Sequence, residues 1–122
     1  MLTSAIKGIF AVTISTYFWS LLFTLFFRFP VPFGGYTGPW EEGAATVSSA
    51  LSDATMAFLF YFVLGGFLLV LPVGVLVGVF VEKDFASASP RIRHRNYALM
   101  GGIIGFCMVL VLSVLDLLIG PW

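Results

Sequence analysis

Charged residues are scarce in this sequence. Only twelve of its 122 residues are Lys, Arg, Asp or Glu, which is 10 %, whereas 60 % are hydrophobic. A soluble domain carries roughly a quarter of charged residues, because water has to solvate its surface. This shortage and a mean hydropathy of +1.06 argue against an ordinary soluble domain and predict a protein embedded in a membrane. The length allows one domain at most.

Cysteine and histidine are almost absent as well. Cys107 is the single cysteine, so an intrachain disulfide is excluded. His94 is the single histidine and lies between apolar runs, so neither haem ligation within a span nor a metal site is expected. The sequence also lacks a Ser–His–acid set, paired intramembrane carboxylates and a phosphate-binding glycine loop. We therefore expect no enzyme activity, and we assign no catalytic, metal-binding or cofactor-binding residue.

Long uncharged runs are what the sequence does contain. Residues 8–27 and 54–81 carry no charge, and residues 97–122 carry only Asp116. A membrane core about 30 Å thick needs roughly 20 apolar residues in an α-helix, and a helix satisfies its backbone hydrogen bonds internally. We predict an all-α membrane protein with a single transmembrane domain over residues 1–122, whose spans cover about 8–28, 54–81 and 97–119.

The second run is too long for an upright span. Its 28 uncharged residues would make a helix about 42 Å long, which has to tilt or extend into the headgroups. Pro72 lies inside this run and removes a backbone donor, so we predict a kink there. Gly65, Gly66 and Gly74 are close enough to ease the bend.

Positive charges predict the orientation. Of the six Lys and Arg residues, five lie before the first run or between the second and third, and only Arg28 lies elsewhere. Positive residues accumulate in cytoplasmic loops. We predict that the N-terminus and the 82–96 loop are cytoplasmic, with the 28–53 loop and the C-terminus outside. The most fitting location is a bacterial inner membrane.

The predicted outer loop has two parts. Residues 29–39 hold three prolines and three glycines, which indicates an irregular connection. The sequence Pro39-Trp40-Glu41-Glu42 is typical of a helix start, so we predict a short interfacial helix that leads through residue 51 into the second span. Trp40 and Trp122 are expected at the outer interface.

Polar and small residues predict where the helices pack. Thr13, Thr16, Ser20 and Thr24 share one face of the first helix. Glycines four residues apart occur on each of the other two helices and let helix backbones approach closely. These glycines are Gly74, Gly78, Gly101 and Gly105. We predict that both sets lie in helix–helix contacts, while a hydroxyl-lined path remains the alternative for the first helix.

Asp116 is the only charge in the third run, and it lies eleven residues after Gly105. That spacing puts both residues on nearly the same helix face, about 20° apart. A charge in such a place needs a partner. Arg28 lies at the same predicted end of the first helix, so we predict an Arg28–Asp116 ion pair. The simpler alternative is that Asp116 reaches interfacial water.

A basic patch precedes the third run. It consists of Arg91, Arg93, His94 and Arg95. Such a patch favours contact with anionic lipid headgroups, and an acidic soluble partner is the alternative.

The absence of chemistry favours a small accessory subunit of a larger membrane protein complex. Its expected partners are other integral membrane subunits and lipids. Nucleic acid is not expected, since six acidic residues balance the six basic ones. The sequence requires no cofactor, although bound lipids are expected. The alternative is a self-oligomerising transporter or channel with a hydroxyl-lined path; a membrane-lesion protein of the phage type has the right size but no positive support.

Overall fold

The computed structural model describes residues 1–32, 35–38 and 46–119. Its elements, in chain order, are helix α1 (Leu2–Phe26), strands β1 (Phe29–Val31) and β2 (Gly35–Thr37), helix α2 (Val47–Tyr61), the π-helical turn η1 (Phe62–Gly66), helix α3 (Phe67–Asp84) and helix α4 (Pro90–Ile119). Three continuous helical stretches are long and apolar enough to cross a membrane: α1, α2–η1–α3 and α4. The predicted all-α class with three candidate spans is confirmed.

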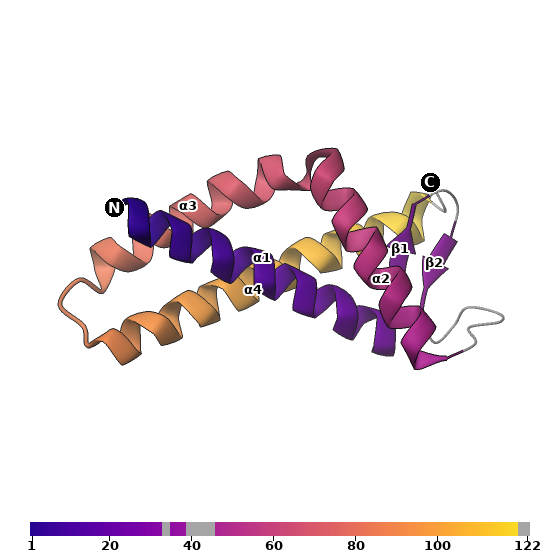
Figure 1. The fold of residues 1–122 in the computed structure, drawn as a ribbon, viewed down its shortest axis with the longest axis horizontal. Helices are drawn as coiled ribbons and strands as arrows, with labels where there is room; N and C mark the ends of the chain where they lie inside the picture. The colour runs from indigo at the N-terminus through magenta and orange to yellow at the C-terminus, as the bar shows by residue number, and fades with distance from the viewer. Residues whose placement is uncertain (33–34, 39–45, 120–122) are drawn as a thin grey trace.

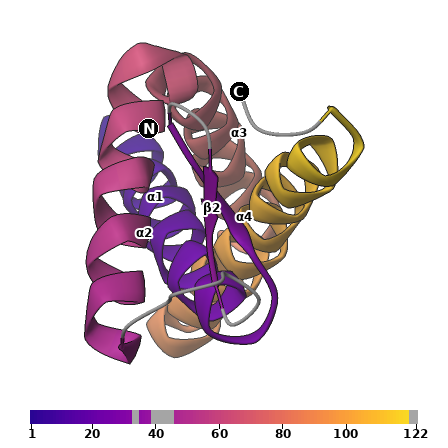
Figure 2. The same cartoon turned by 90° about the vertical axis from the view of Figure 1, so that its right-hand side faces the viewer.

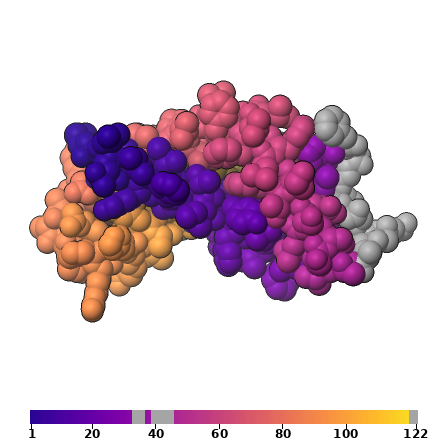
Figure 3. Space-filling view, in the orientation of Figure 1, coloured from indigo at the N-terminus to yellow at the C-terminus, as the bar shows by residue number. Residues whose placement is uncertain are grey.

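The helices form a three-membered bundle with α1 in the middle (Figure 1). The N-terminus of α1 and the connection between α3 and α4 lie at one end, which we call the basic end. The β-strands and the last turns of α4 lie at the other, which we call the hairpin end. Figure 3 shows α1 running diagonally across one face, between α2–α3 and α4.

Two apolar clusters make the core. The cluster toward the basic end is built from Val12, Val70, Val77, Val81 and Tyr97, and the cluster toward the hairpin end from Phe29, Ala54, Ala57 and Val109. Most of these side chains are small or β-branched, so the helices lie close together. Further large apolar side chains, such as Phe62, Met108 and Phe23, pack against these clusters while partly buried, and many others are exposed, as expected when hydrocarbon surrounds the bundle.

The second span is broken at Gly65. Residues Val47–Asp84 form 38 residues of helix, which would be about 57 Å long if straight. Gly65 has φ 146° and ψ −11°, a backbone conformation outside the helical region, and glycine adopts it because it has no Cβ. Pro72, where the sequence predicts a kink, lies within helix α3, and the residue with non-helical backbone angles is Gly65.

The segment after α1 forms a short hairpin. Strands β1 and β2 pair antiparallel, with Phe29 opposite Thr37 and Val31 opposite Gly35. The sequence predicts an irregular connection over residues 29–39, and six of these residues form the two short strands instead. Pro30 is tolerated because a two-stranded hairpin has edges where a missing donor costs no ladder bond.

The predicted interfacial helix is not present as a separate element in the described residues. Val47–Leu51 are the first turns of α2 and continue directly into the second span. Thr46 and Ser49 cap this start reciprocally: the Ser49 amide donates to Thr46 Oγ1 (3.1 Å) and the Thr46 amide donates to Ser49 Oγ (3.2 Å). The start predicted at Pro39–Glu42, and Trp40 and Trp122, lie outside the described residues.

Candidate functional site

Helix α1 contacts its neighbours through one line of small residues. Its buried residues recur every fourth position, and they are Ser4, Gly8, Val12, Thr16, Ser20 and Thr24. The structure thus puts Thr16, Ser20 and Thr24 into the helix contacts, and it leaves Thr13 half-buried beside them. Sequence reasoning missed Ser4 and Gly8, although the four-residue spacing of small side chains extends back to both.

The paired glycines of α3 and α4 all face α1. A Cβ on Gly74 would lie 2.5 Å from the Ile9 Cα, and one on Gly78 would lie 2.8 Å from the Ala5 Cα. On α4, a Cβ at Gly101 would lie 2.8 Å from the Ala11 carbonyl carbon. Real Cβ atoms are not found so close to backbone, so the helices approach to a distance that only glycine permits.

Gly105 extends the same contact along α4. A Cβ there would lie 2.7 Å from the Thr16 amide nitrogen. One turn away, the Trp19 indole donates a hydrogen bond of 2.8 Å to the Gly102 carbonyl, which links α1 and α4. The Trp19 ring also packs edge-on against Phe106, with centroids 5.0 Å apart. The sequence analysis does not single out Trp19, although its place near the middle of the 8–27 run distinguishes it from an interfacial tryptophan.

Three buried hydroxyls of α1 are engaged within their own helix. Thr16 Oγ1 donates to the Val12 carbonyl at 2.8 Å, Ser20 Oγ to the Tyr17 carbonyl at 2.6 Å, and Thr24 Oγ1 to the Ser20 carbonyl at 2.9 Å. Side chains that bond their own backbone present carbon to the neighbouring helix. The hydroxyls of Thr16, Ser20 and Thr24 are thus satisfied locally, on the face of α1 that packs against the other helices.

Arg28 and Asp116 form an ion pair at the hairpin end. Arg28 Nη2 contacts Asp116 Oδ2, and the Asp116 side chain is fully buried whereas that of Arg28 is 18 % exposed. Ser113, one turn before Asp116, donates from Oγ to the Arg28 carbonyl at 3.0 Å. These contacts tie the end of α1 to α4. The interfacial-water alternative for Asp116 does not fit its burial.

The second oxygen of Asp116 is also buried. Among the described residues, Asp116 Oδ1 has no hydrogen-bond partner. A buried carboxylate relies on charge and hydrogen bonds to offset its lost hydration. The pair with Arg28 is therefore the main compensation for this charge within the described part of the chain.

The basic patch divides into one paired residue and three exposed ones. Arg93 Nη1 lies 3.3 Å from Glu82 Oε1, and Ser4 Oγ donates to Glu82 Oε2 at 3.1 Å. Glu82 thus joins the basic ends of α1, α3 and α4. The exposed members are Arg91, His94 and Arg95. They leave a positive surface at this end.

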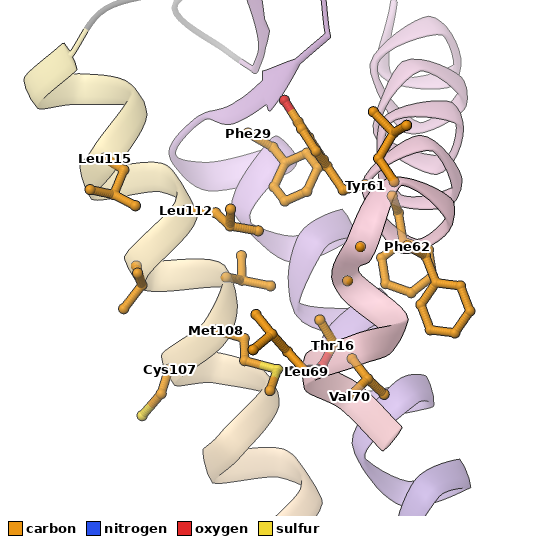
Figure 4. Close-up of a pocket in the computed structure, with 16 residues that line it drawn as sticks. Thr16, Phe29, Tyr61, Phe62, Leu69, Val70, Cys107, Met108, Leu112 and Leu115 are labelled. Atoms are coloured by element: carbon orange, nitrogen blue, oxygen red, sulfur yellow. Dashed lines mark hydrogen bonds between the residues drawn. The ribbon is translucent and has the colours of Figure 1, made fainter. Parts of the chain in front are cut away.

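An apolar cavity of about 570 Å³ lies between the second span and α4. Figure 4 shows Met108 and Leu112 of α4 on one side of it and Leu69 of α3 on the other, with Phe29 of the hairpin above. The cavity is lined mainly by aliphatic and aromatic side chains. Two hydroxyl groups occur among the lining residues, those of Thr16 and Tyr61. The sequence did not predict this cavity.

The cavity exists because α2 and α4 diverge toward the hairpin end. Viewed from that end, the hairpin lies between the two helices (Figure 2). Gly65 and Gly66, at the break in the second span, form part of the wall. The break and the hairpin together hold the helices apart.

The described residues offer no metal site. They contain no group of three or more His, Cys, Asp or Glu side chains that could hold an ion. Cys107 is a free, exposed thiol at the cavity.

Comparison with known proteins adds no assignment. No protein family, curated protein or solved structure matches this chain.

Proposed function

We propose that this chain is a small accessory subunit of a larger integral membrane protein assembly, which it stabilises through helix packing and lipid contacts. The observation that carries the proposal is the contrast between a closed interior and an open apolar exterior. In each span, only 22 % of the most apolar window is buried inside the chain. The rest is available to lipid and to neighbouring helices.

The tight packing of helices inside the chain supports this proposal. Glycine contacts and locally bonded hydroxyls fill the space around α1. Such packing serves to hold three helices together. It speaks against the alternative of a hydroxyl-lined transporter, because Thr16, Ser20 and Thr24 would have to leave these contacts to line a path.

The exterior supports it by its composition. Phe10 and Phe18 are 62 % and 55 % exposed on α1, and Leu68 is 64 % exposed on α3. Large exposed apolar patches mark surfaces that contact other proteins or lipid. In the predicted orientation, Arg91 and Arg95 would contact lipid headgroups on the cytoplasmic side.

The first experiment is co-purification. The chain, tagged at its C-terminus, is extracted from its own membrane in a mild detergent and analysed by native mass spectrometry. Co-migration with other membrane proteins at a fixed ratio supports the proposal. Migration only as copies of itself overturns it and favours the self-oligomerising alternative.

Site-specific crosslinking refines that result. A photoreactive amino acid is placed in turn at Phe18, Leu68 and Ile103, which are exposed on α1, α3 and α4. A subunit held in one orientation should crosslink to the same protein from one or two of these helices and only to lipid from the others. Equal, diffuse crosslinking from all three helices would contradict a specific interface.

A further inference from the structure

We propose that the cavity between the second span and α4 binds one hydrocarbon chain of a membrane lipid. This inference goes beyond the proposed function and does not depend on whether the chain belongs to an assembly. It rests on the shape, lining and depth of the cavity.

The lining selects an apolar ligand. Thr16 Oγ1, the one polar group contributed by α1, already donates to the Val12 carbonyl at 2.8 Å and contacts the Met108 sulfur at 3.8 Å. Cavities lined by aliphatic and aromatic side chains stay dry, because water finds too few partners there. Water is therefore a poor occupant, and hydrocarbon is a good one.

The size of the cavity suits a chain. Its volume of about 570 Å³ lies within the roughly 300–1,000 Å³ of pockets that hold small ligands. An empty cavity of this size would leave Phe62, Met108 and Leu112 without contacts on one side. Filling by a flexible chain restores those contacts.

The cavity opens sideways and is closed above and below. Phe29, which is 1 % exposed, covers it at the hairpin end. Toward the basic end, Val70, which is 5 % exposed, forms part of its lining (Figure 4). The exposed residues Leu64, Val111 and Leu115 border it.

This shape favours a lipid chain over a partner helix. A transmembrane helix is about 10 Å wide with its side chains and crosses the whole bilayer. It could not enter without displacing Phe29, which packs in the core with Ala54, Ala57 and Val109. An acyl chain can enter from the side, and the bilayer supplies such chains at the depth of the opening.

The break at Gly65 helps to shape the wall of the cavity. The π-helical turn contains Gly65 and Gly66, which add no side chains to this wall. A Cβ on Gly66 would lie 2.8 Å from the Tyr61 carbonyl oxygen.

The test uses the purified full chain in vesicles of phosphatidylcholine that contain a trace of phosphatidylcholine with a diazirine on one acyl chain. After irradiation, labelled positions are mapped by mass spectrometry. Labelling should concentrate on cavity residues that are less exposed, such as Val70, Met108 and Leu112. It should also saturate as the photoreactive lipid increases, as expected for a site. Labelling spread evenly over all exposed apolar faces, and linear in probe lipid, would overturn the proposal.

A matched pair of variants sharpens this test. Leu112→Trp fills the cavity, whereas Leu110→Trp adds the same ring at nearly the same depth on α4, away from the lining. Labelling of Val70 and Met108 should fall by about tenfold in Leu112→Trp and stay unchanged in Leu110→Trp. Unchanged labelling in a folded Leu112→Trp protein would refute the site.

The wild-type measurement stands if Leu112→Trp does not fold, because saturation is read without any variant. Crosslinking of the cavity to another protein in native membranes would also overturn the proposal. Absence of saturable labelling leaves co-purification of the chain with partners untouched, so failure of this inference can be distinguished from failure of the proposed function.

Discussion

Gly101 and Gly102 are neighbours on α4 that should respond oppositely to the same substitution. A Cβ on Gly101 would lie 2.8 Å from both the carbonyl carbon and the carbonyl oxygen of Ala11. A Cβ on Gly102 would meet nothing within 4 Å. Gly101→Ala therefore tests the backbone contact between α1 and α4, and Gly102→Ala is its matched control.

The expected magnitudes follow from two terms. Alanine in place of glycine within a helix is favourable by roughly 0.5–1 kcal/mol. Forcing a methyl group into a packed contact costs typically about 1–3 kcal/mol. Gly101→Ala should therefore lower the free energy of unfolding by roughly 1–2 kcal/mol, whereas Gly102→Ala should leave it unchanged or raise it by up to about 1 kcal/mol.

The assay is reversible unfolding in mixed micelles, with increasing mole fractions of a denaturing detergent and helix content followed by circular dichroism. Tryptophan fluorescence reports in parallel, because the Trp19 indole bonds the Gly102 carbonyl across the same contact. Equal midpoints for Gly101→Ala and Gly102→Ala would refute the inferred approach of α1 and α4. So would a stabilised Gly101→Ala protein.

Three further predictions concern the ion pair, the break and the thiol. Asp116→Asn should destabilise the fold by about 3 kcal/mol, because it leaves Arg28 beside a neutral partner in a mostly buried site. The double variant Arg28→Met/Asp116→Leu should recover much of that loss in the same unfolding assay. If the losses of the two single-site changes add up instead, the pair is contradicted. Gly65→Ala should lower the free energy of unfolding by about 1–2 kcal/mol, because a φ of 146° strains any residue with a side chain, although no atom lies within 4 Å of the added Cβ. An unchanged free energy of unfolding would show that the backbone at Gly65 is not held in this conformation. Cys107, exposed at the depth of the spans, should resist both N-ethylmaleimide and a charged thiol reagent in intact vesicles, because maleimides attack a thiolate and hydrocarbon does not solvate that anion. It should react once the protein is denatured in detergent, and rapid reaction in intact vesicles would place it in contact with water.

The helices could be predicted because hydrocarbon leaves the backbone no other hydrogen-bond partners. Their ends were predicted less well: α1 begins at Leu2 and α4 at Pro90, several residues before the uncharged runs. Charged residues end a membrane span, but they do not end a helix, so Lys7 and the basic patch lie within helices.

The pairing of Arg28 with Asp116 follows from helix periodicity and from position near helix ends, both of which are present in a sequence. The hairpin and the cavity could not be predicted in this way. The hairpin depends on the pairing of Phe29 with Thr37, and the cavity depends on the backbone of Gly65 and on the divergence of α2 from α4. Pro72 was the stronger local signal for a kink, but the break occurs where a positive φ is tolerated. The roles in an assembly and in lipid binding stay predictions.

The four-residue repeat on α1 has a geometric consequence. Each step of four residues advances about 400° around a helix with 100° per residue, so the line of contact shifts by about 40° per step. From Ser4 to Thr24 it turns through about 200°, more than half a revolution around α1. Neighbours that follow this spiral cannot run parallel to α1 or to each other along its whole length. They cross it obliquely and spread apart, and the opening between α2 and α4 is the space that this winding leaves.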